Sequence, residues 1–85
     1  MAIKFPKDFL YEDESYRSFS HPKLRIQKDH WYYPNKENVQ ISIIAGQGCY
    51  GDGNETFEFW DYFKMEEPRG YMNIVEIDKY LEENY

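Results

Sequence analysis

Two strand-like runs separated by a glycine-rich segment restrict the fold of this chain more than any other part of it. Val39, Ile41 and Ile43 recur at every second position, which places them on one face of a strand. The run 56–63 alternates in the same way, and the segment 46–53 between the runs holds four of the five glycines. Consecutive strands with a turn-forming connection predict an antiparallel hairpin in the middle of a sheet.

The second run also predicts which side chains form the core. Its alternation places Phe57, Phe59 and Phe63 on the buried face, with Asp61 as a misfit on that face. The opposite face then receives Glu58, Trp60 and Tyr62.

Weaker strand signals lie on both sides of this hairpin. Alternation in 23–27 predicts a half-buried strand with Leu24 and Ile26 facing the core. The aromatic run 30–33 is also typical of a strand, and the two segments form either a hairpin or one bent strand. We expect a short edge strand at 71–72, after the turn that Pro68, Arg69 and Gly70 indicate.

The last segment carries the clearest helix signal. Asn73 and Glu76 have the spacing of a capping box, in which each side chain bonds the other residue's backbone N–H. Helical spacing then gives one apolar stripe, formed by Ile74, Ile77, Tyr80 and Leu81. Strands followed by a helix predict an α+β fold, in which a small antiparallel sheet of three to four strands has the C-terminal helix packed on one face. The 85 residues, 1–85, leave room for one domain.

Composition limits the chemistry of the chain. A single cysteine and two histidines allow neither an internal disulfide nor a structural zinc site. No apolar run is long enough to span a membrane, so we expect a cytoplasmic protein. Nine tyrosines are more than a core of this size can hide, and exposed tyrosines are typical of protein interfaces.

The motifs for catalysis and cofactors are incomplete. Gly46 to Gly51 match G-x-G-x-x-G, but a strand follows where a dinucleotide site needs a helix. The oxygen ligands of Asp52, Asn54 and Glu55 lack the spacing of a calcium loop. No nucleophile motif joins Cys49 to a histidine. We therefore expect no enzyme activity, no cofactor and no metal.

Charge is distributed unevenly along the chain. The formal net charge of the chain is −6. Residues 51–85 alone carry about −7, so the first fifty residues are nearly neutral. Carboxylates among exposed rings favour docking on a basic protein groove that otherwise holds nucleic acid. We expect these partner-binding residues: Tyr50, Asp52, Glu55, Glu58, Trp60, Tyr62, Glu66 and Glu67. Direct nucleic-acid binding is disfavoured by the net charge, although the basic and aromatic stretch 21–36 leaves it open.

The segment Ile41-Ser-Ile-Ile-Ala-Gly-Gln-Gly-Cys-Tyr-Gly-Asp-Gly-Asn-Glu-Thr-Phe-Glu58 resembles one found in small uncharacterised proteins of phages and prophages. It covers under a quarter of the chain and carries no functional residue across. In size, acidity and tyrosine content the chain is similar to phage inhibitors of host defence, the anti-CRISPR proteins among them. The resemblance implies a non-catalytic phage or mobile-element protein that inhibits a host complex handling nucleic acid. The alternative is a small structural or assembly protein that forms homo-oligomers through a sheet edge or an aromatic patch.

Overall fold

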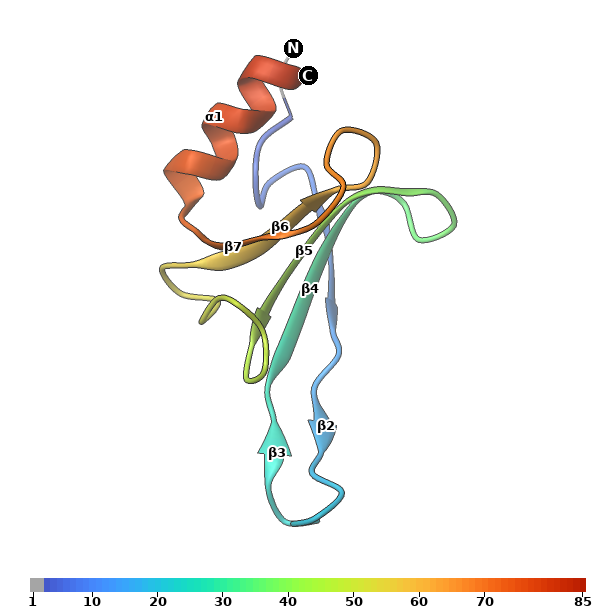
Figure 1. Ribbon diagram of the computed structural model, residues 1–85. Helices are drawn as coiled ribbons and strands as arrows, with labels where there is room; N and C mark the ends of the chain where they lie inside the picture. The colour runs from blue at the N-terminus through green and yellow to red at the C-terminus, as the bar shows by residue number, and fades with distance from the viewer. Residues whose placement is uncertain (1–2) are drawn as a thin grey trace.

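The computed structural model describes residues 3–85. Within them, strands precede a C-terminal helix (Figure 1). The elements are β1 (Leu10–Asp13), β2 (Tyr16–Arg17), β3 (Arg25–Ile26), β4 (Lys28–Pro34), β5 (Val39–Gly46), β6 (Phe57–Asp61), β7 (Arg69–Met72) and α1 (Ile74–Asn84).

The main sheet is antiparallel and has the strand order β1-β4-β5-β6-β7. The predicted hairpin is confirmed as β5 and β6, and β5 lies at the centre of the sheet. The α+β fold is also confirmed, but the sheet has five strands instead of three to four. The prediction missed β1, whose residues Leu10–Asp13 show no apolar alternation because this edge strand is mostly exposed.

One face of the sheet carries the core. Ile41, Ile43 and Phe59 are fully buried there. Two segments cover this face. The N-terminal segment supplies Phe5 and Phe9, and α1 supplies Ile77 and Leu81. Edge-to-face ring contacts tie both segments to β6, with centroids 5.0 Å apart for Phe5 and Phe57 and for Phe59 and Tyr80.

The predicted capping box begins α1. The Asn73 side chain accepts a hydrogen bond from the Glu76 N–H at 2.8 Å, and the Glu76 carboxylate accepts one from the Asn73 N–H at 3.1 Å. Ile77 and Leu81 are buried as the helical stripe predicts, whereas Ile74 stays 39% exposed at the first turn.

The prediction that Phe63 lies in the core is wrong. Its side chain is 75% exposed. The strand β6 ends at Asp61, because the Met65 N–H bonds back to the Asp61 carbonyl at 2.9 Å and turns the chain. The period-two alternation therefore stops two residues before Phe63.

Leu24 and Ile26 were also expected in the core, and this is wrong. They belong to a separate two-stranded ribbon, β2 and β3, which extends the β1 and β4 pair beyond the sheet (Figure 1). Leu24 is about half exposed, because neither the helix nor the N-terminal segment reaches this ribbon. The sequence allowed segments 23–27 and 30–33 to form either a hairpin or one bent strand, and the structure shows one bent strand, formed by β3 and β4.

Asp61 is a fully buried carboxylate on the core face. It accepts hydrogen bonds from the hydroxyls of Tyr80 and Tyr85, at 2.8 and 2.7 Å, and from the backbone N–H groups of Phe63 and Lys64. The predicted misfit is therefore the centre of a polar network that links the end of β6 to α1.

This network predicts a loss of stability at high pH. Burial and the hydrogen bond to Asp61 raise the pKa of Tyr80, and the same causes raise the pKa of Tyr85. A pKa raised on folding means that the protonated hydroxyl stabilises the fold. This contribution is complete below the unfolded pKa of about 10 and is lost as the pH rises above it.

We therefore expect the free energy of unfolding to fall above about pH 10, as measured by urea denaturation at a series of pH values. The fall should be less steep in the double variant Tyr80→Phe, Tyr85→Phe, although that variant is less stable at neutral pH. Equal steepness in the two proteins would show that other groups cause the effect.

Candidate functional site

The sheet face turned away from α1 is the candidate site, and we call it the open face. Its side chains form two rows of cross-strand neighbours. The rows are His30, Ile44 and Glu58, then Tyr32, Ser42 and Trp60. Between them lies a shallow hollow of about 250 Å³, lined by Glu14, Lys28, His30, Ser42, Ile44, Glu58, Trp60 and Tyr62.

Two aromatic rings border the hollow, one half-buried and one exposed. Trp60 and Tyr62 meet edge to face, with centroids 4.8 Å apart. The indole N–H of Trp60 donates to the carbonyl of Met65 at 3.2 Å, which fixes the ring, and Tyr62 remains 44% exposed. Large rings held in place by their neighbours lose little conformational entropy on binding, which suits them as contact residues.

A second ring pair extends this surface toward the edge strand β7. Tyr50 and Tyr71 have centroids 5.9 Å apart, the Tyr50 N–H donates to Glu58 Oε1 at 3.0 Å, and the Tyr71 N–H donates to the Tyr50 carbonyl at 2.7 Å. Tyr71 adopts φ 57°, in the left-handed region that costs a residue other than glycine about 1–2 kcal/mol. Residues with a strained backbone conformation of this kind gather at functional sites.

Four of the expected partner-binding residues are thereby brought together, with one addition. We define the aromatic cluster as Tyr50, Glu58, Trp60, Tyr62 and Tyr71. The sequence analysis missed Tyr71 as a contact residue, although its position after Gly70 at an expected edge strand was a usable signal.

The other four expected residues lie at the two ends of β6. Asp52 and Glu55 precede this strand, whereas Glu66 and Glu67 follow it. A five-residue strand separates its ends by about 17 Å. The eight residues therefore do not form one compact patch.

Asp52 has a structural role in its own loop. Its carboxylate accepts hydrogen bonds from the backbone N–H groups of Asn54, Glu55 and Thr56, at 2.8, 2.8 and 3.1 Å. These three bonds lower the pKa of Asp52 and keep it ionised. The carboxylate stabilises the glycine-rich connection, as expected for an Asx-type turn.

His30 lies at the centre of a polar network on the open face. Its Nδ1 is 2.9 Å from Glu14 Oε2, and its Nε2 is 2.9 Å from Ser42 Oγ. Lys28 Nζ lies 3.5 Å from the same Glu14. Burial alone would raise the pKa of Glu14, but the hydrogen bond from His30 and the charge of Lys28 outweigh it, so this pKa is lowered.

Glu12, Glu14 and His30 place their ligand atoms within 4.8 Å of one another, a spacing that a metal ion could use. Each of them already has a partner, since both His30 nitrogens are bonded and Glu12 pairs with Lys36 at 3.1 Å. A cation would have to displace these contacts, so the network is complete without one. The sequence analysis missed this grouping because Glu12 meets His30 only through the β1 and β4 register.

Cys49 has none of the features of a reactive thiol. It is half-buried, and burial together with the negative charge of Glu58 raises its pKa. Because the thiolate is the nucleophilic form, a raised pKa disfavours nucleophilic chemistry.

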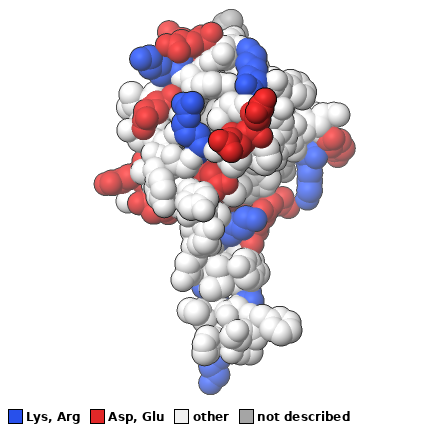
Figure 2. Space-filling view, viewed as in Figure 1, with Lys and Arg blue, Asp and Glu red and all other residues white. Residues whose placement is uncertain are grey.

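In the part of the chain that the structure describes, no ion pair involves a carboxylate of the acidic segment 51–85. Within residues 3–85, the pairs closer than 4 Å all join groups between Glu12 and Lys36. The ten carboxylates of residues 51–85 therefore have no lysine or arginine within 4 Å among the described residues. Figure 2 shows that red and blue side chains are interspersed over the wide part of the molecule in that view, so acidic groups there do not form one continuous field.

The fold and the site define a small α+β protein with one covered and one open sheet face. No protein family, no curated protein and no solved structure matches the chain. Among residues 3–85, α1 is neither long nor apolar enough to cross a bilayer, and no other helix offers a candidate span.

Proposed function

We propose that this protein is a non-catalytic binding protein that docks through its aromatic cluster on a basic surface of a partner protein. The supporting observation is the ring pair of half-buried Trp60 and exposed Tyr62 on the open face, beside Glu58, which has no cationic partner in residues 3–85. Tryptophan and tyrosine dominate the binding energy of many interfaces, and unpaired carboxylates speed association with a basic surface.

The partner class follows from the charge. A basic surface that accepts carboxylates and rings is typical of proteins that hold nucleic acid. The phosphates of nucleic acid are negatively charged, as carboxylates are, and its bases are flat rings, as aromatic side chains are. We propose that the protein inhibits such a partner by occupying this surface. The resemblance of residues 41–58 to phage and prophage proteins supports a host defence complex as the partner.

The test is capture of a partner from bacterial lysate, followed by affinity measurements on the purified pair. Trp60→Ala should weaken binding at least about 30-fold, because loss of a central interface ring typically costs about 2 kcal/mol or more. Glu58→Gln keeps the acceptor for the Tyr50 N–H but removes the charge, and should reduce the salt dependence of association.

Val75→Ala is the matched control, because Val75 is an exposed apolar residue of α1 outside the aromatic cluster. Its affinity should equal that of the unchanged protein. Binding indifferent to Trp60→Ala, or a partner that still binds nucleic acid in the complex, would contradict the proposal.

The alternative, self-association, has structural support in the sheet, which has two edge strands, β1 and β7. A homo-oligomer in sedimentation that Trp60→Ala dissociates would instead assign the cluster to self-association.

A further inference from the structure

The ribbon formed by β2 and β3 projects from the molecule as an arm, which we define as residues 15–28. It lies at the end of the molecule opposite α1 (Figure 1). The molecule measures 44 Å along its longest axis against 26 and 25 Å along the others. The arm has no part in the core described above, and the proposed docking through the aromatic cluster does not use it.

The arm is basic throughout. Residues 15–28 contain two arginines and two lysines but no aspartate or glutamate. In Figure 2 the arm shows blue side chains and no red ones. The rest of the chain therefore carries about −10, so the arm and the rest of the molecule have net charges of opposite sign.

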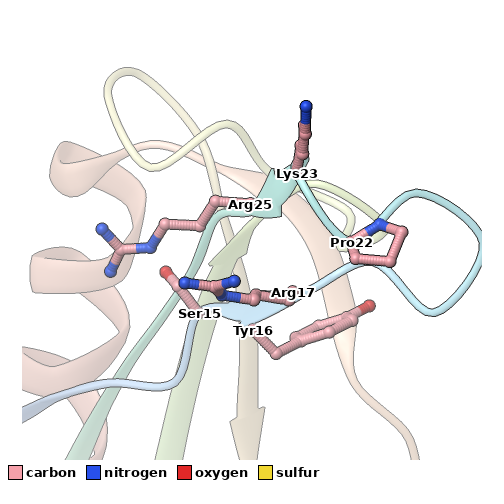
Figure 3. A pocket seen from close by; sticks show the side chains of 6 residues that line it. All are labelled: Ser15, Tyr16, Arg17, Pro22, Lys23 and Arg25. Carbon is pink, nitrogen blue, oxygen red and sulfur yellow. The ribbon is translucent and has the colours of Figure 1, made fainter.

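Arg17 and Arg25 lie directly opposite each other across the ribbon. Like charges in this position destabilise a strand pair. Arg25 has an exposed partner in Asp13, at 2.6 Å, whereas Arg17 and Lys23 have no ion-pair partner within residues 3–85. Figure 3 shows Arg17 and Arg25 running toward the same side of the ribbon. An external anion between them would relieve the repulsion.

The arm also exposes apolar surface that the fold does not cover. Phe19 is fully exposed at the turn, and Tyr16 and Leu24 are about half exposed. Beside them lies an open hollow of about 640 Å³ (Figure 3), lined by Ser15, Tyr16, Arg17, Pro22, Lys23 and Arg25. Cations and rings in one small element match a ligand that offers phosphates and bases together.

We propose that the arm binds nucleic acid, with Arg17, Lys23 and Arg25 on phosphates and the ring of Phe19 against the bases. A two-stranded ribbon fits the major groove of a duplex, and aromatic side chains stack on unpaired bases. Both kinds of nucleic acid share this chemistry, and the experiment below separates them.

The acidic body does not exclude this binding. At 0.1 M salt the Debye length is about 10 Å, so charges separated by more than this distance act almost independently. The long axis exceeds each of the others by more than this length. Arg17 and Lys23, which have no ion-pair partner among residues 3–85, can therefore meet phosphates that the body would repel at contact, and Arg25 would exchange its exposed partner Asp13 for a phosphate. A complex of protein and nucleic acid would bind both the aromatic cluster and the arm, because it presents a basic protein surface and exposed phosphates.

The experiment measures fluorescence anisotropy of a labelled duplex of about 20 base pairs, or two helical turns, and of a single strand of equal length. Three phosphate contacts predict a slope of about −2.7 for log affinity against log salt on the duplex, which is about a 40-fold loss between roughly 50 and 200 mM salt. The triple variant Arg17→Ala, Lys23→Ala, Arg25→Ala should reduce affinity at least about tenfold and flatten the slope.

Two single variants refine the assignment. Phe19→Ala should weaken binding to the single strand about five- to 150-fold if its ring stacks on a base. Lys79→Ala removes an exposed cation of α1 and should leave affinity unchanged, whereas Lys23→Ala, which removes one charge at the arm, should lower it. Preference for duplex or single strand identifies the form that the arm recognises.

Three results would overturn the proposal. One is the absence of binding at low salt with protein at about 100 μM, the weak limit of non-specific affinity. Another is an equal loss of nucleic-acid affinity in Lys79→Ala and Lys23→Ala. The third is a dimer that the triple variant dissociates, with no nucleic-acid binding, which would assign the arm to the acidic body of a second copy. The assay contains only the purified protein and nucleic acid, so its outcome is independent of the proposed docking on a partner protein.

Discussion

Replacing Asp61 by alanine is expected to lower the free energy of unfolding by about 3–5 kcal/mol, because it removes the acceptor from a buried hydrogen-bond network. The hydroxyls of Tyr80 and Tyr85 would lose their shared partner, and the turn after β6 would lose two bonds from its N–H groups. A domain of this length is stable by only about 4–13 kcal/mol in total, so the expected loss is a large fraction of the free energy of unfolding. Urea denaturation followed by circular dichroism measures the change.

Two variants separate the network from a general effect of substitution. Asp61→Asn keeps one acceptor oxygen and should cost less than Asp61→Ala. The triple variant Asp61→Leu, Tyr80→Phe, Tyr85→Phe removes the acceptor and both hydroxyls together. It should be more stable than Asp61→Leu alone, because no buried hydroxyl is then left unpaired. A cost below about 1 kcal/mol for Asp61→Ala would show that water replaces the carboxylate.

The parts of the fold that could be predicted depend on local sequence signals. The alternation of Val39, Ile41 and Ile43 is set by the strand itself, and the capping box of Asn73 and Glu76 lies within one helical turn. Both were predicted correctly. Phe63 was placed wrongly because the alternation continues in the sequence beyond the point where backbone bonds to Asp61 end the strand.

The elements that could not be predicted depend on distant partners. The edge strand β1 forms because Leu10–Asp13 pair with β4, and its own residues carry no apolar pattern. The ribbon of β2 and β3 has alternation but no core to face, so period alone assigned Leu24 to the interior. Length and polarity could not show that this alternation belongs to an arm.

The candidate site likewise has one part that local sequence predicts and another that depends on distant partners. Glu58, Trp60 and Tyr62 could be grouped from the sequence, because one strand alternates them onto one face. The contact between Glu14 and His30, and the ring pair of Tyr50 and Tyr71, join residues that only the sheet register brings together. The summed charge of residues 51–85 could not show that two of these carboxylates, Asp52 and Asp61, bond their own turns.

Replacing Gly46 by alanine is the second substitution with a large expected effect, at about 3 kcal/mol or more. Gly46 ends β5 at φ 121°, and an added Cβ would lie in the backbone of Gln27, closest to its carbonyl oxygen. That oxygen accepts the Gln47 N–H at 2.9 Å, so relieving the clash breaks the bond that holds the glycine-rich connection against the start of β4.

Gly48→Ala is the control for this substitution, because Gly48 also has a positive φ, 85°, but nothing lies within 4 Å of its added Cβ. It should cost only the left-handed strain of about 1–2 kcal/mol. Because the clash involves Gln27, beside β3, Gly46→Ala should also speed amide hydrogen exchange in β3 and β4 relative to Gly48→Ala. Equal stabilities for the two variants would show that strain in φ, and not contact with the backbone of Gln27, requires glycine at position 46.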